Sequence, residues 1–463
     1  MMPPPHDSPQ AAEPPGDAQP RELLQALYWA GVHAAAPGPS LRAALERRPA
    51  RFARQVWLVA LGKAAYPMAT AAVAELKARG AEPAGGIVIA QGVHTPPHPR
   101  IECVQGDHPV PGAHSAQAAA RLEALTRRVG QDDDAWVLLS GGASSLASAP
   151  VQGIDMDALK ALNTLLLGSG LAITPMNRIR KRFMRWGAGR LALALKRAQI
   201  HQFVISDVIG DDLAIIGSGP CVPDDTTAAG VRDALVQAGL WDRTPASMQR
   251  FLRAAMEDPR LETPKPDHPV FDRVETEIIA SNRIALQAIA RDATARGYTP
   301  RLMPDPLVGE AAQAGRAIAE ALAGECAAVA SAASARGKPR CVIWGGETTV
   351  TLDRTAPDTG GGRCQELALS AAQQLELHER GPEPLALLAA GTDGRDGPSD
   401  AAGAIITPQS WDAIRRAGRD PARDLAAHAS HAALDAAGAL FRTGLTETNV
   451  MDVVIGICGL AAR

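Results

Sequence analysis

The stretch AWVLLSGGASS, residues 135–145, decides the fold. Its first five residues form an apolar run with the length and composition of a strand that is buried on both faces. Ser140, Gly141 and Gly142 end that run, and a helix can begin directly behind them. A strand that passes through glycine into a helix predicts an α/β domain, with a parallel sheet covered by helices on both faces.

The same alternation continues on both sides of this stretch. The expected strands are residues 56–61, 86–90, 101–104, 135–139 and 201–205 in the first half, and 274–280, a strand near Thr299, 341–344, 349–352 and 385–390 in the second. The expected helices are a segment ending near Leu76, residues 114–129, 155–167 and 175–197, a helix from Asn282, and residues 309–335. Pro264, Pro266 and Pro269 crowd together without helical or strand periodicity, which is typical of a domain boundary. We therefore expect a disordered tail over 1–20, one α/β domain over 21–262 and a second over 270–463, with a cleft between the two domains.

Composition excludes several classes of function. The chain has 463 residues, a formal net charge of −3 and 3% aromatic residues. It therefore lacks both the basic surface and the stacking side chains of a nucleic-acid-binding protein. No stretch of 18 apolar residues predicts a membrane-spanning helix, and the N-terminus does not resemble a signal peptide, so we expect a cytoplasmic protein without a membrane partner. The six cysteines have no paired or zinc-like spacing, and we expect reduced thiols.

Chemistry is expected where the strands end, because open α/β sheets bind ligands beyond the carboxyl ends of their strands. Glycine with hydroxyl or acidic residues follows five expected strands: Gly62 and Lys63; Ser140, Gly141, Gly142 and Ser144; Asp207, Asp211 and Asp212; Gly345, Gly346, Glu347 and Thr348; and Asp393. Each loop alone has an ordinary explanation as a tight turn or a helix cap. Together they indicate backbone donors for a phosphate group, with carboxylates that could bind a nucleotide-bound magnesium ion.

Two cations stand out among these loops. Lys63 is one of seven lysines, against forty arginines, and directly follows an apolar strand. Arg363 follows three glycines, and its alternatives are a dangling surface arginine or a phosphoryl-transfer clamp on a flexible loop. We interpret both as groups that offset charge on a transferring phosphoryl group.

Three further patterns are weaker. The basic run Arg178, Arg180, Lys181, Arg182 and Arg185 predicts a solvated helix face in preference to an anion site. Gly187, Gly189 and Ala192 mimic a dinucleotide fingerprint but follow a helix, and we discount them. A Walker A sequence is absent.

The loops, taken in order, resemble the type-2 glycerate kinase family, whose C-terminal part is the MOFRL domain. The resemblance extends from Leu24 to Cys458. It rests on Gly62-Lys63-Ala64-Ala65, Asp107-His108-Pro109-Val110-Pro111, Leu139-Ser140-Gly141-Gly142, Arg180-Lys181, Gly189-Arg190-Leu191-Ala192, Ile205-Ser206-Asp207-Val208, Gly210-Asp211-Asp212, Ser281-Asn282, Gly309-Glu310-Ala311, Gly345-Gly346-Glu347-Thr348-Thr349-Val350, Gly361-Gly362-Arg363, Thr392-Asp393-Gly394 and Thr448-Asn449-Val450-Met451-Asp452.

The resemblance implies a Rossmann-like N-terminal domain, a C-terminal MOFRL domain and ATP-dependent phosphorylation of D-glycerate to 2-phosphoglycerate. It makes Lys63 and Arg363 the expected catalytic pair, and Asp207 or Asp393 would orient the hydroxyl group of the substrate. It also adds Asn282 and Glu310 to the expected cofactor-binding residues, with Mg²⁺ held by phosphates and by Asp207, Asp211 or Asp393.

The chain departs from the family pattern at Ala143, Gly187, Cys364, Leu445 and Glu447, so the acid substrate is less well defined than the reaction. The alternatives are a kinase for a related sugar acid, a ligand-binding homologue with weakened catalysis, and a hydroxypyruvate reductase. The sequence leaves the oligomeric state open, a homodimer included.

Overall fold

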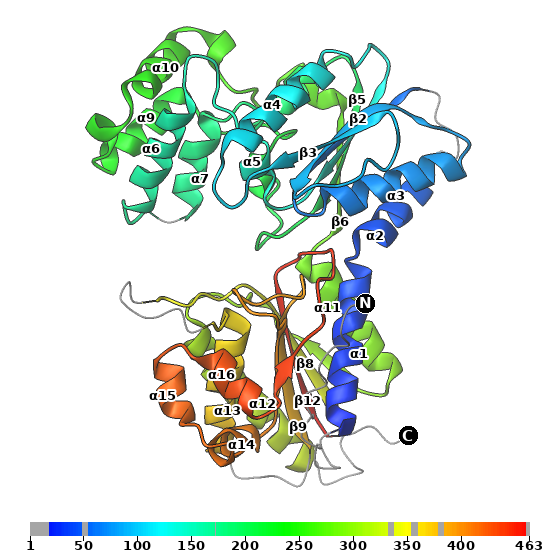
Figure 1. Cartoon of the computed structure of the whole chain (residues 1–463), viewed down its shortest axis with the longest axis vertical. Coiled ribbons are helices and arrows are strands. Elements are labelled where there is room, and N and C mark those ends of the chain that lie inside the picture. Colours follow the sequence, from blue (N-terminus) through cyan, green and yellow to red (C-terminus); the bar gives the residue numbers. More distant parts are fainter. Residues whose placement is uncertain are drawn as a thin grey trace, which may run out of the picture. The chain divides into compact units, whose positions relative to one another are not determined.

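The computed structural model describes residues 18–48, 54–171, 173–331, 338–352, 360–377 and 384–459. These residues form two compact units (Figure 1). The Lys63 unit is Pro37–Ser281, and the Arg363 unit combines residues 18–36 with the chain from Asn282 onward. The expected two-domain α/β organisation is therefore confirmed, and the expected cleft stays a prediction.

The domain boundaries differ from the expected ones at both ends of the Lys63 unit. The strand Val274–Ala280 (β6) lies after the proline-rich segment, yet it pairs in parallel with Gln199–Ile205 (β5) and so completes the first sheet. At the other end, the helix Ala18–Ala34 (α1) packs against the Arg363 unit. Of the expected disordered tail, residues 1–17 lie outside the described residues, and residues 18–20 begin this helix.

The Lys63 unit contains a six-stranded parallel sheet with the order β3-β2-β1-β4-β5-β6. Its other strands are β1 (Val56–Leu61), β2 (Pro83–Gln91), β3 (Ile101–Gly106) and β4 (Asp134–Leu139). This order is that of a Rossmann fold, in which the direction of winding reverses between β1 and β4 and the ligand crevice opens at that point. The expected Rossmann-like domain is confirmed.

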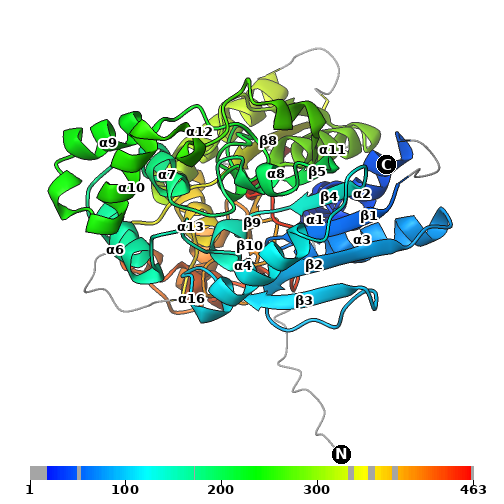
Figure 2. The same cartoon turned by 90° about the horizontal axis from the view of Figure 1, so that it is seen from above.

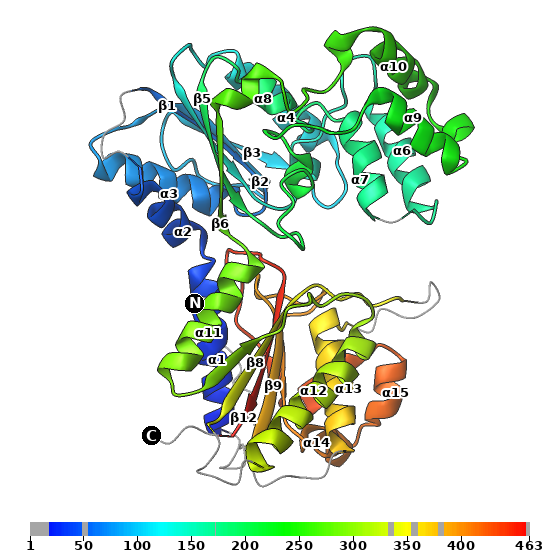
Figure 3. The same cartoon turned by 180° about the vertical axis from the view of Figure 1, so that it is seen from behind.

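Helices cover both faces of this sheet. The helices α2 (Pro37–Glu46) and α3 (Ala65–Ala78) lie against one face, and α4 (Ala113–Thr126), α5 (Ala143–Leu146) and α8 (Arg190–Ala194) lie against the other (Figures 1 and 3). Every residue of β1 and β4 is buried, which explains the apolar run that fills β1 and the one that follows Asp134 in β4.

Four more helices form a separate cluster beside the sheet (Figure 2). They are α6 (Met156–Leu167), α7 (Ile173–Arg182), α9 (Ala228–Gln237) and α10 (Ala246–Glu257), and they share a core of their own. The single helix expected over residues 175–197 is wrong. It divides into α7 and α8, because Ala188 and Gly189 between them adopt positive φ.

Within its described residues, the Arg363 unit also has a six-stranded sheet, in the order β11-β10-β9-β12-β8-β7. They are β7 (Thr299–Leu302), β8 (Arg340–Gly346), β9 (Leu385–Gly391), β10 (Gly403–Ile406), β11 (Leu440–Phe441) and β12 (Asp452–Cys458). Only β7 and β8 run parallel, and the other pairs are antiparallel. The expected strand over 349–352 is wrong, because only an isolated bridge joins Thr349 to Glu310.

This mixed sheet lies in the middle of three layers. Helices α1 and α11 (Asn282–Ala295) cover one face, and α12 (Ala311–Ser331) and α13 (Arg363–Glu376) cover the other (Figures 1 and 3). Three short helices flank α13: α14 (Ser410–Arg416), α15 (Pro421–Ala426) and α16 (Ser430–Ala436).

One expectation about the cysteines is wrong. Cys326 on α12 and Cys458 on β12 form a disulfide, whereas the remaining four cysteines are free. The two partners are 132 residues apart in sequence, so spacing alone does not reveal the pairing. In the described part of the chain, none of the helices combines the length and apolar character needed to cross a bilayer.

Candidate active site

The loops after β1 and β4 are hydrogen-bonded to each other at the carboxyl ends of these strands in the Lys63 unit. The Lys63 backbone N–H donates to the Gly141 carbonyl at 2.9 Å, and the Ala64 N–H donates to the Ser140 Oγ at 2.9 Å. The Ser140 hydroxyl is therefore used to hold the Lys63 loop. Lys63 itself is exposed. The structure thus brings Lys63, Ser140 and Gly141 together at the point where the sheet reverses its winding.

Asp207, which follows β5, lies against the same loop. A Cβ atom at Gly141 would be 1.7 Å from Asp207 Oδ2, so only glycine allows this approach. Burial raises the pKa of Asp207 above its usual range, and the charge of Lys63 opposes that shift. A carboxylate with a raised pKa beside a lysine is a common feature of catalytic sites.

His108 is a member of this cluster that the sequence interpretation did not select. A Cβ atom at Gly142 would be 3.0 Å from His108 Cδ2 and 3.4 Å from Lys63 Cγ, so both the histidine and the lysine lie close to Gly142. Burial and the charge of Lys63 lower the pKa of His108. The motif Asp107-His108-Pro109, which is part of the family resemblance, is the signal in the sequence that points to His108.

The other predicted residues of this unit have local partners. The Ser144 Oγ lies 2.8 Å from the Ser218 Oγ, so this hydroxyl pairs within the protein. Asp211 lies in a turn at φ 56°, and Asp212 Oδ1 accepts from the Ala214 N–H at 2.9 Å. Asp212 therefore acts as a turn residue, whereas the metal-binding role of Asp211 stays a prediction.

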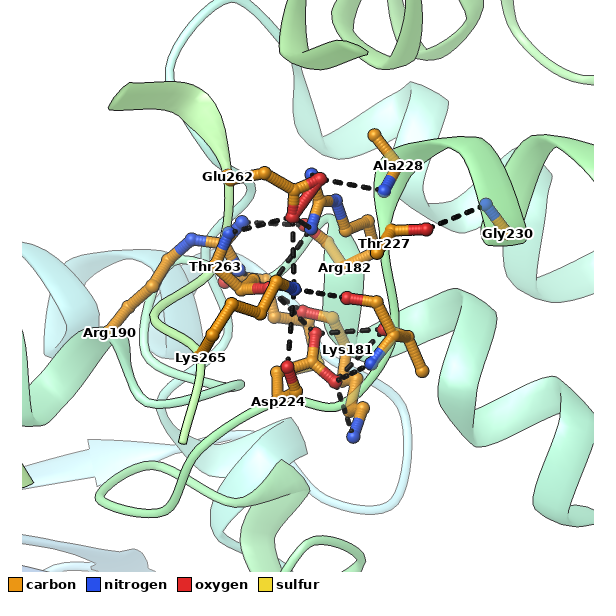
Figure 4. Close-up of polar contacts among 12 residues, drawn as sticks. Lys181, Arg182, Arg190, Asp224, Thr227, Ala228, Gly230, Glu262, Thr263 and Lys265 are labelled. Atoms are coloured by element: carbon orange, nitrogen blue, oxygen red, sulfur yellow. Dashed lines mark hydrogen bonds and ion pairs between the residues drawn. The ribbon is translucent and has the colours of Figure 1, made fainter. Parts of the chain in front are cut away.

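The basic run at the end of α7 is mainly structural. Lys181 pairs with Asp224 at 2.9 Å, and both side chains are buried, while Arg182 binds both carboxylate oxygens of Glu262 at 2.6 and 2.7 Å (Figure 4). Arg185 pairs with Glu123 at 2.6 Å. A solvated face is therefore the wrong interpretation of the run. Only Arg180 keeps the character of an anion site, because it is partly buried and has no side-chain partner in the described part of the chain.

These ion pairs hold the helical cluster together, and the Arg185–Glu123 pair connects the chain after α7 to α4 on the sheet. Glu262 follows α10 and also accepts from the Ala228 N–H at the start of α9, so one carboxylate links α7, α9 and the chain after α10. Although burial acts to raise the pKa of Glu262, the pairing with Arg182 lowers it to about 2. Arg190, which begins α8, donates to carbonyl oxygens of residues 181, 182 and 184, and burial lowers its pKa to about 10. The fingerprint-like segment around Gly189 is thus a helix-to-helix connection.

In the Arg363 unit the carboxyl ends of β8 and β9 meet the beginning of β12, because β12 runs antiparallel to both. Asp452 starts β12 opposite Gly346 of β8 and Gly391 of β9. Arg363 starts α13, and its Nε and Nη2 lie 2.6 and 2.9 Å from the two oxygens of Asp452. Its Nη1 lies 2.8 Å from Glu347 Oε1. The picture of Arg363 on a flexible loop is wrong, since two carboxylates fix the guanidinium at the start of a helix.

Asp393 lies at the same edge, directly after β9. Thr392, which precedes it, exchanges hydrogen bonds with the chain before β12: its Oγ1 donates to the Met451 carbonyl at 2.6 Å and accepts from the Val450 N–H at 2.9 Å. The Arg395 N–H donates to Asp393 Oδ1 at 3.0 Å. Tyr28 of α1 donates to the Gly391 carbonyl at 2.9 Å, and burial together with the Asp393 charge raises the pKa of Tyr28.

Asn282 and Gly345 have structural contacts that account for their identities. The Asn282 amide donates to the carbonyls of Val450 and Asp452 at 2.8 and 2.9 Å. A Cβ atom at Gly345 would be 1.9 Å from Asn282 Oδ1, so the strand end must be glycine for this amide to fit. Thr348 is buried. The Glu310 carboxylate accepts hydrogen bonds from the backbone N–H and the hydroxyl group of Thr351. A role of these residues in cofactor binding stays a prediction.

The arrangement suits phosphoryl chemistry without a preformed metal cage. Each unit places one cation and at least one carboxylate at the strand edge where the glycine-rich loops lie. Among the described residues, no three histidine, cysteine or acidic side chains are grouped as a metal site.

Comparison with known proteins places this site in a family. A profile described as "Domain of unknown function (DUF4147)" matches residues 23–253, and one described as "MOFRL family" matches residues 340–452. A Thermotoga maritima protein named D-glycerate 2-kinase is 35% identical over 417 residues, covering 90% of this chain and 94% of that protein. An Agrobacterium vitis protein named putative hydroxypyruvate reductase is 36% identical, covering 94% of each chain.

A crystal structure of Thermotoga maritima glycerate kinase matches the fold over both units. It superimposes with a TM-score of 0.83 at 33% sequence identity and covers 95% of this chain and 99% of that one. The sequence match and the fold match both extend over at least 90% of this chain, and the two family profiles match successive segments of it. The chain belongs to the glycerate kinase family that combines a DUF4147 region with a MOFRL domain.

Proposed function

We propose that the protein phosphorylates D-glycerate with ATP and Mg²⁺, giving 2-phosphoglycerate, in the cytoplasm. The observation that carries the proposal is the cluster of Lys63, Asp207 and the Ser140–Gly142 loop at the switch point of a Rossmann-like sheet. Membership of a family with relatives named glycerate kinases gives the substrate.

Each residue of the cluster has a proposed role, and so have Arg363 and Asp393 of the other unit. Lys63 and Arg363 offset the negative charge that develops on the transferring phosphoryl group, and the backbone N–H groups of the Ser140–Gly142 loop bind an anionic group. Asp207 or Asp393 orients the hydroxyl group that attacks, and accepts its proton. The raised pKa of Asp207 favours it over Asp393 for the proton-accepting role.

Mg²⁺ bound to the phosphates of ATP would supply further positive charge at the transferred group. Asp207, Asp211 or Asp393 would contribute its protein ligand. Because one carboxylate holds the metal in this arrangement, we expect the metal to bind together with the nucleotide.

The proposal is tested by incubating the protein with ATP, Mg²⁺ and D-glycerate and following the products by phosphorus NMR together with ADP release. We expect 2-phosphoglycerate; 3-phosphoglycerate would keep the kinase but overturn the assigned hydroxyl, and no turnover would overturn the substrate. Lys63→Ala should lower kcat about 10²-fold or more, an effect of at least about 3 kcal/mol. Full activity in this variant would remove Lys63 from the mechanism.

Hydroxypyruvate reduction is the second candidate, because the Agrobacterium vitis relative carries that name. A nicotinamide cofactor needs a glycine-rich turn directly after a strand, whereas the candidate turn here follows α7 and leads into α8. Titration with NADH and NADPH, followed by fluorescence, separates the two functions. We expect no binding; saturable binding with oxidation of the cofactor by hydroxypyruvate would favour the reductase.

A further inference from the structure

The guanidinium of Arg363 contacts two carboxylates, Asp452 and Glu347, whose side chains differ greatly in solvent exposure. Asp452 receives Nε and Nη2 in a two-bond fork at 2.6 and 2.9 Å, and its side chain is 5% exposed. Glu347 receives Nη1 at 2.8 Å, and its side chain is 43% exposed. The two contacts therefore differ in kind, since one lies in the interior of the unit and the other faces solvent.

The position of Asp452 is fixed by the sheet. Asp452 begins β12, which lies between β8 and β9, so backbone pairing holds it on both sides. The Asn282 amide also binds the Asp452 carbonyl at 2.9 Å. A carboxylate on a doubly flanked strand is a rigid anchor, and a bidentate arginine bound to such an anchor keeps one orientation.

Glu347 is the more exposed of the two carboxylates. Glu347 follows β8, is exposed, and contacts Arg363 through the nitrogen that the fork does not use. An exposed ion pair contributes little stability and exchanges readily with another anion. A phosphate oxygen is an equivalent acceptor for the same N–H group.

We propose that Asp452 is a positioning residue for Arg363, holding Nε and Nη2 so that Nη1 is presented to a phosphate oxygen, which takes the place of Glu347. The inference rests on the proposed kinase function and adds a residue and a sequence of contacts to it. Asp452 does not touch the substrate in this mechanism; its effect passes through the orientation of the guanidinium.

A double-mutant cycle tests the positioning role. Arg363→Ala should lower kcat about 10²-fold or more, and Asp452→Asn should lower kcat at least about tenfold with a smaller change in KM. In the Arg363→Ala background, Asp452→Asn should cause no further loss, because the group through which it acts is gone. Additive losses would show that Asp452 acts independently of Arg363 and would overturn the inference.

Rescue of activity by free guanidinium distinguishes a positioning role of Asp452 from a purely structural one. Added guanidinium ion should restore part of the activity of Arg363→Ala, since Asp452 still offers both oxygen atoms. It should fail to restore the Arg363→Ala/Asp452→Asn variant. Equal rescue of both proteins would overturn the inference.

The controls separate this inference from the function on which it rests. Arg419 and Asp424, which are not among the proposed site residues, form the same two-bond pair, with hydrogen bonds of 2.8 and 2.9 Å. Asp424→Asn therefore reports the cost of losing such a pair and should leave kcat unchanged. Full activity in Arg363→Ala would remove Arg363 from the reaction. Loss of activity in Arg363→Ala with an unaffected Asp452→Asn would leave the kinase standing and overturn only the role of Asp452.

A second substitution covers the case in which Asp452→Asn does not fold. Arg363→Lys retains the charge but presents no planar fork. We expect its kcat to fall close to that of Arg363→Ala. Retention of most of the wild-type kcat by Arg363→Lys would overturn the inference, because charge alone would then be sufficient.

Discussion

At the scale of single residues, Lys63 acts on its neighbours through charge. It lowers the pKa of His108 and opposes the burial that raises the pKa of Asp207. Both effects favour protonation states that suit acid–base chemistry near neutral pH: a neutral imidazole and an ionised carboxylate.

Removal of the Lys63 charge should therefore change the pKa of His108. We expect Lys63→Met to raise the pKa of His108, because one of the two causes that lower it is lost. The titration of the imidazole resonances by NMR measures the shift. Lys77→Met, which changes a lysine at the end of α3, serves as the control and should leave the titration unchanged. An unchanged titration in Lys63→Met would contradict the electrostatic coupling.

Glu447 illustrates a different property of single residues, the cost of backbone conformation. It is one of the positions at which the chain departs from the family pattern, and its φ is 63°, in the left-handed region that side chains disfavour. We expect Glu447→Gly to stabilise the Arg363 unit by about 0.5–1 kcal/mol, measured by urea unfolding. Leu445→Gly in the same loop, where φ is not positive, should destabilise it instead. Equal effects of the two glycines would contradict this explanation.

At the scale of elements, the ion pairs at the end of α7 explain how the helical cluster is held. Arg182 is fully buried, and both of its carboxylate contacts go to Glu262. Breaking a buried pair leaves one charge without a partner, which costs more than the pair contributes when it is intact.

The stability of this joint should depend on pH. Glu262 has its pKa lowered to about 2, so its contribution is present above pH 4.5 and is lost as the pH falls toward 2. Glu262→Gln should reduce the free energy of unfolding by about 3 kcal/mol at neutral pH. The difference from the wild type should shrink in urea unfolding at pH 4 and below. Glu257→Gln, an exposed carboxylate at the end of α10, is the control, and a pH-independent difference for Glu262→Gln would contradict the assignment.

The elements also show what a sequence can predict. The parallel strands were recognisable because strands buried on both faces have uninterrupted apolar sequences, and their carboxyl ends collect functional residues. Lys63, Ser140 and Asp207 were found by that rule. The same rule did not select Asp452, because this residue begins an antiparallel strand. Strand β6 was assigned to the wrong domain, because the proline-rich segment before it does not end the sheet.

At the scale of the whole molecule, α1 connects distant parts of the sequence. Leu24, Leu27 and Tyr28 pack with Leu388 of β9 and Ile455 of β12 in one core. Tyr28 also binds the carbonyl that precedes the Thr392–Asp393 segment. The helix thus supports the edge of the sheet where Asp393 and Asp452 lie, although it is more than 350 residues away from them in sequence.

Removal of α1 should affect one unit selectively. Deletion of residues 1–34 exposes the sheet face that α1 covers, which costs several kcal/mol of hydrophobic burial. We expect hydrogen exchange, followed by mass spectrometry, to show loss of protection in β9 and β12 and retained protection in β1 and β4. Tyr28→Phe, which removes one hydrogen bond, is the mild control and should cost about 1 kcal/mol. Equal loss of protection in both sheets would contradict the assignment of α1 to the Arg363 unit.

The Arg363 unit is discontinuous in sequence, and this affects the order in which the two units can fold during synthesis on the ribosome. Its first helix is synthesised before the entire Lys63 unit, and its central strand β12 is among the last segments to emerge. At a synthesis rate of about 5–20 residues per second, tens of seconds pass between the synthesis of α1 and that of β12, and the apolar face of α1 stays uncovered during this time. The Lys63 unit can complete its sheet during that interval, so the nascent chain acquires one finished domain while the partner strands of its first helix are still being made.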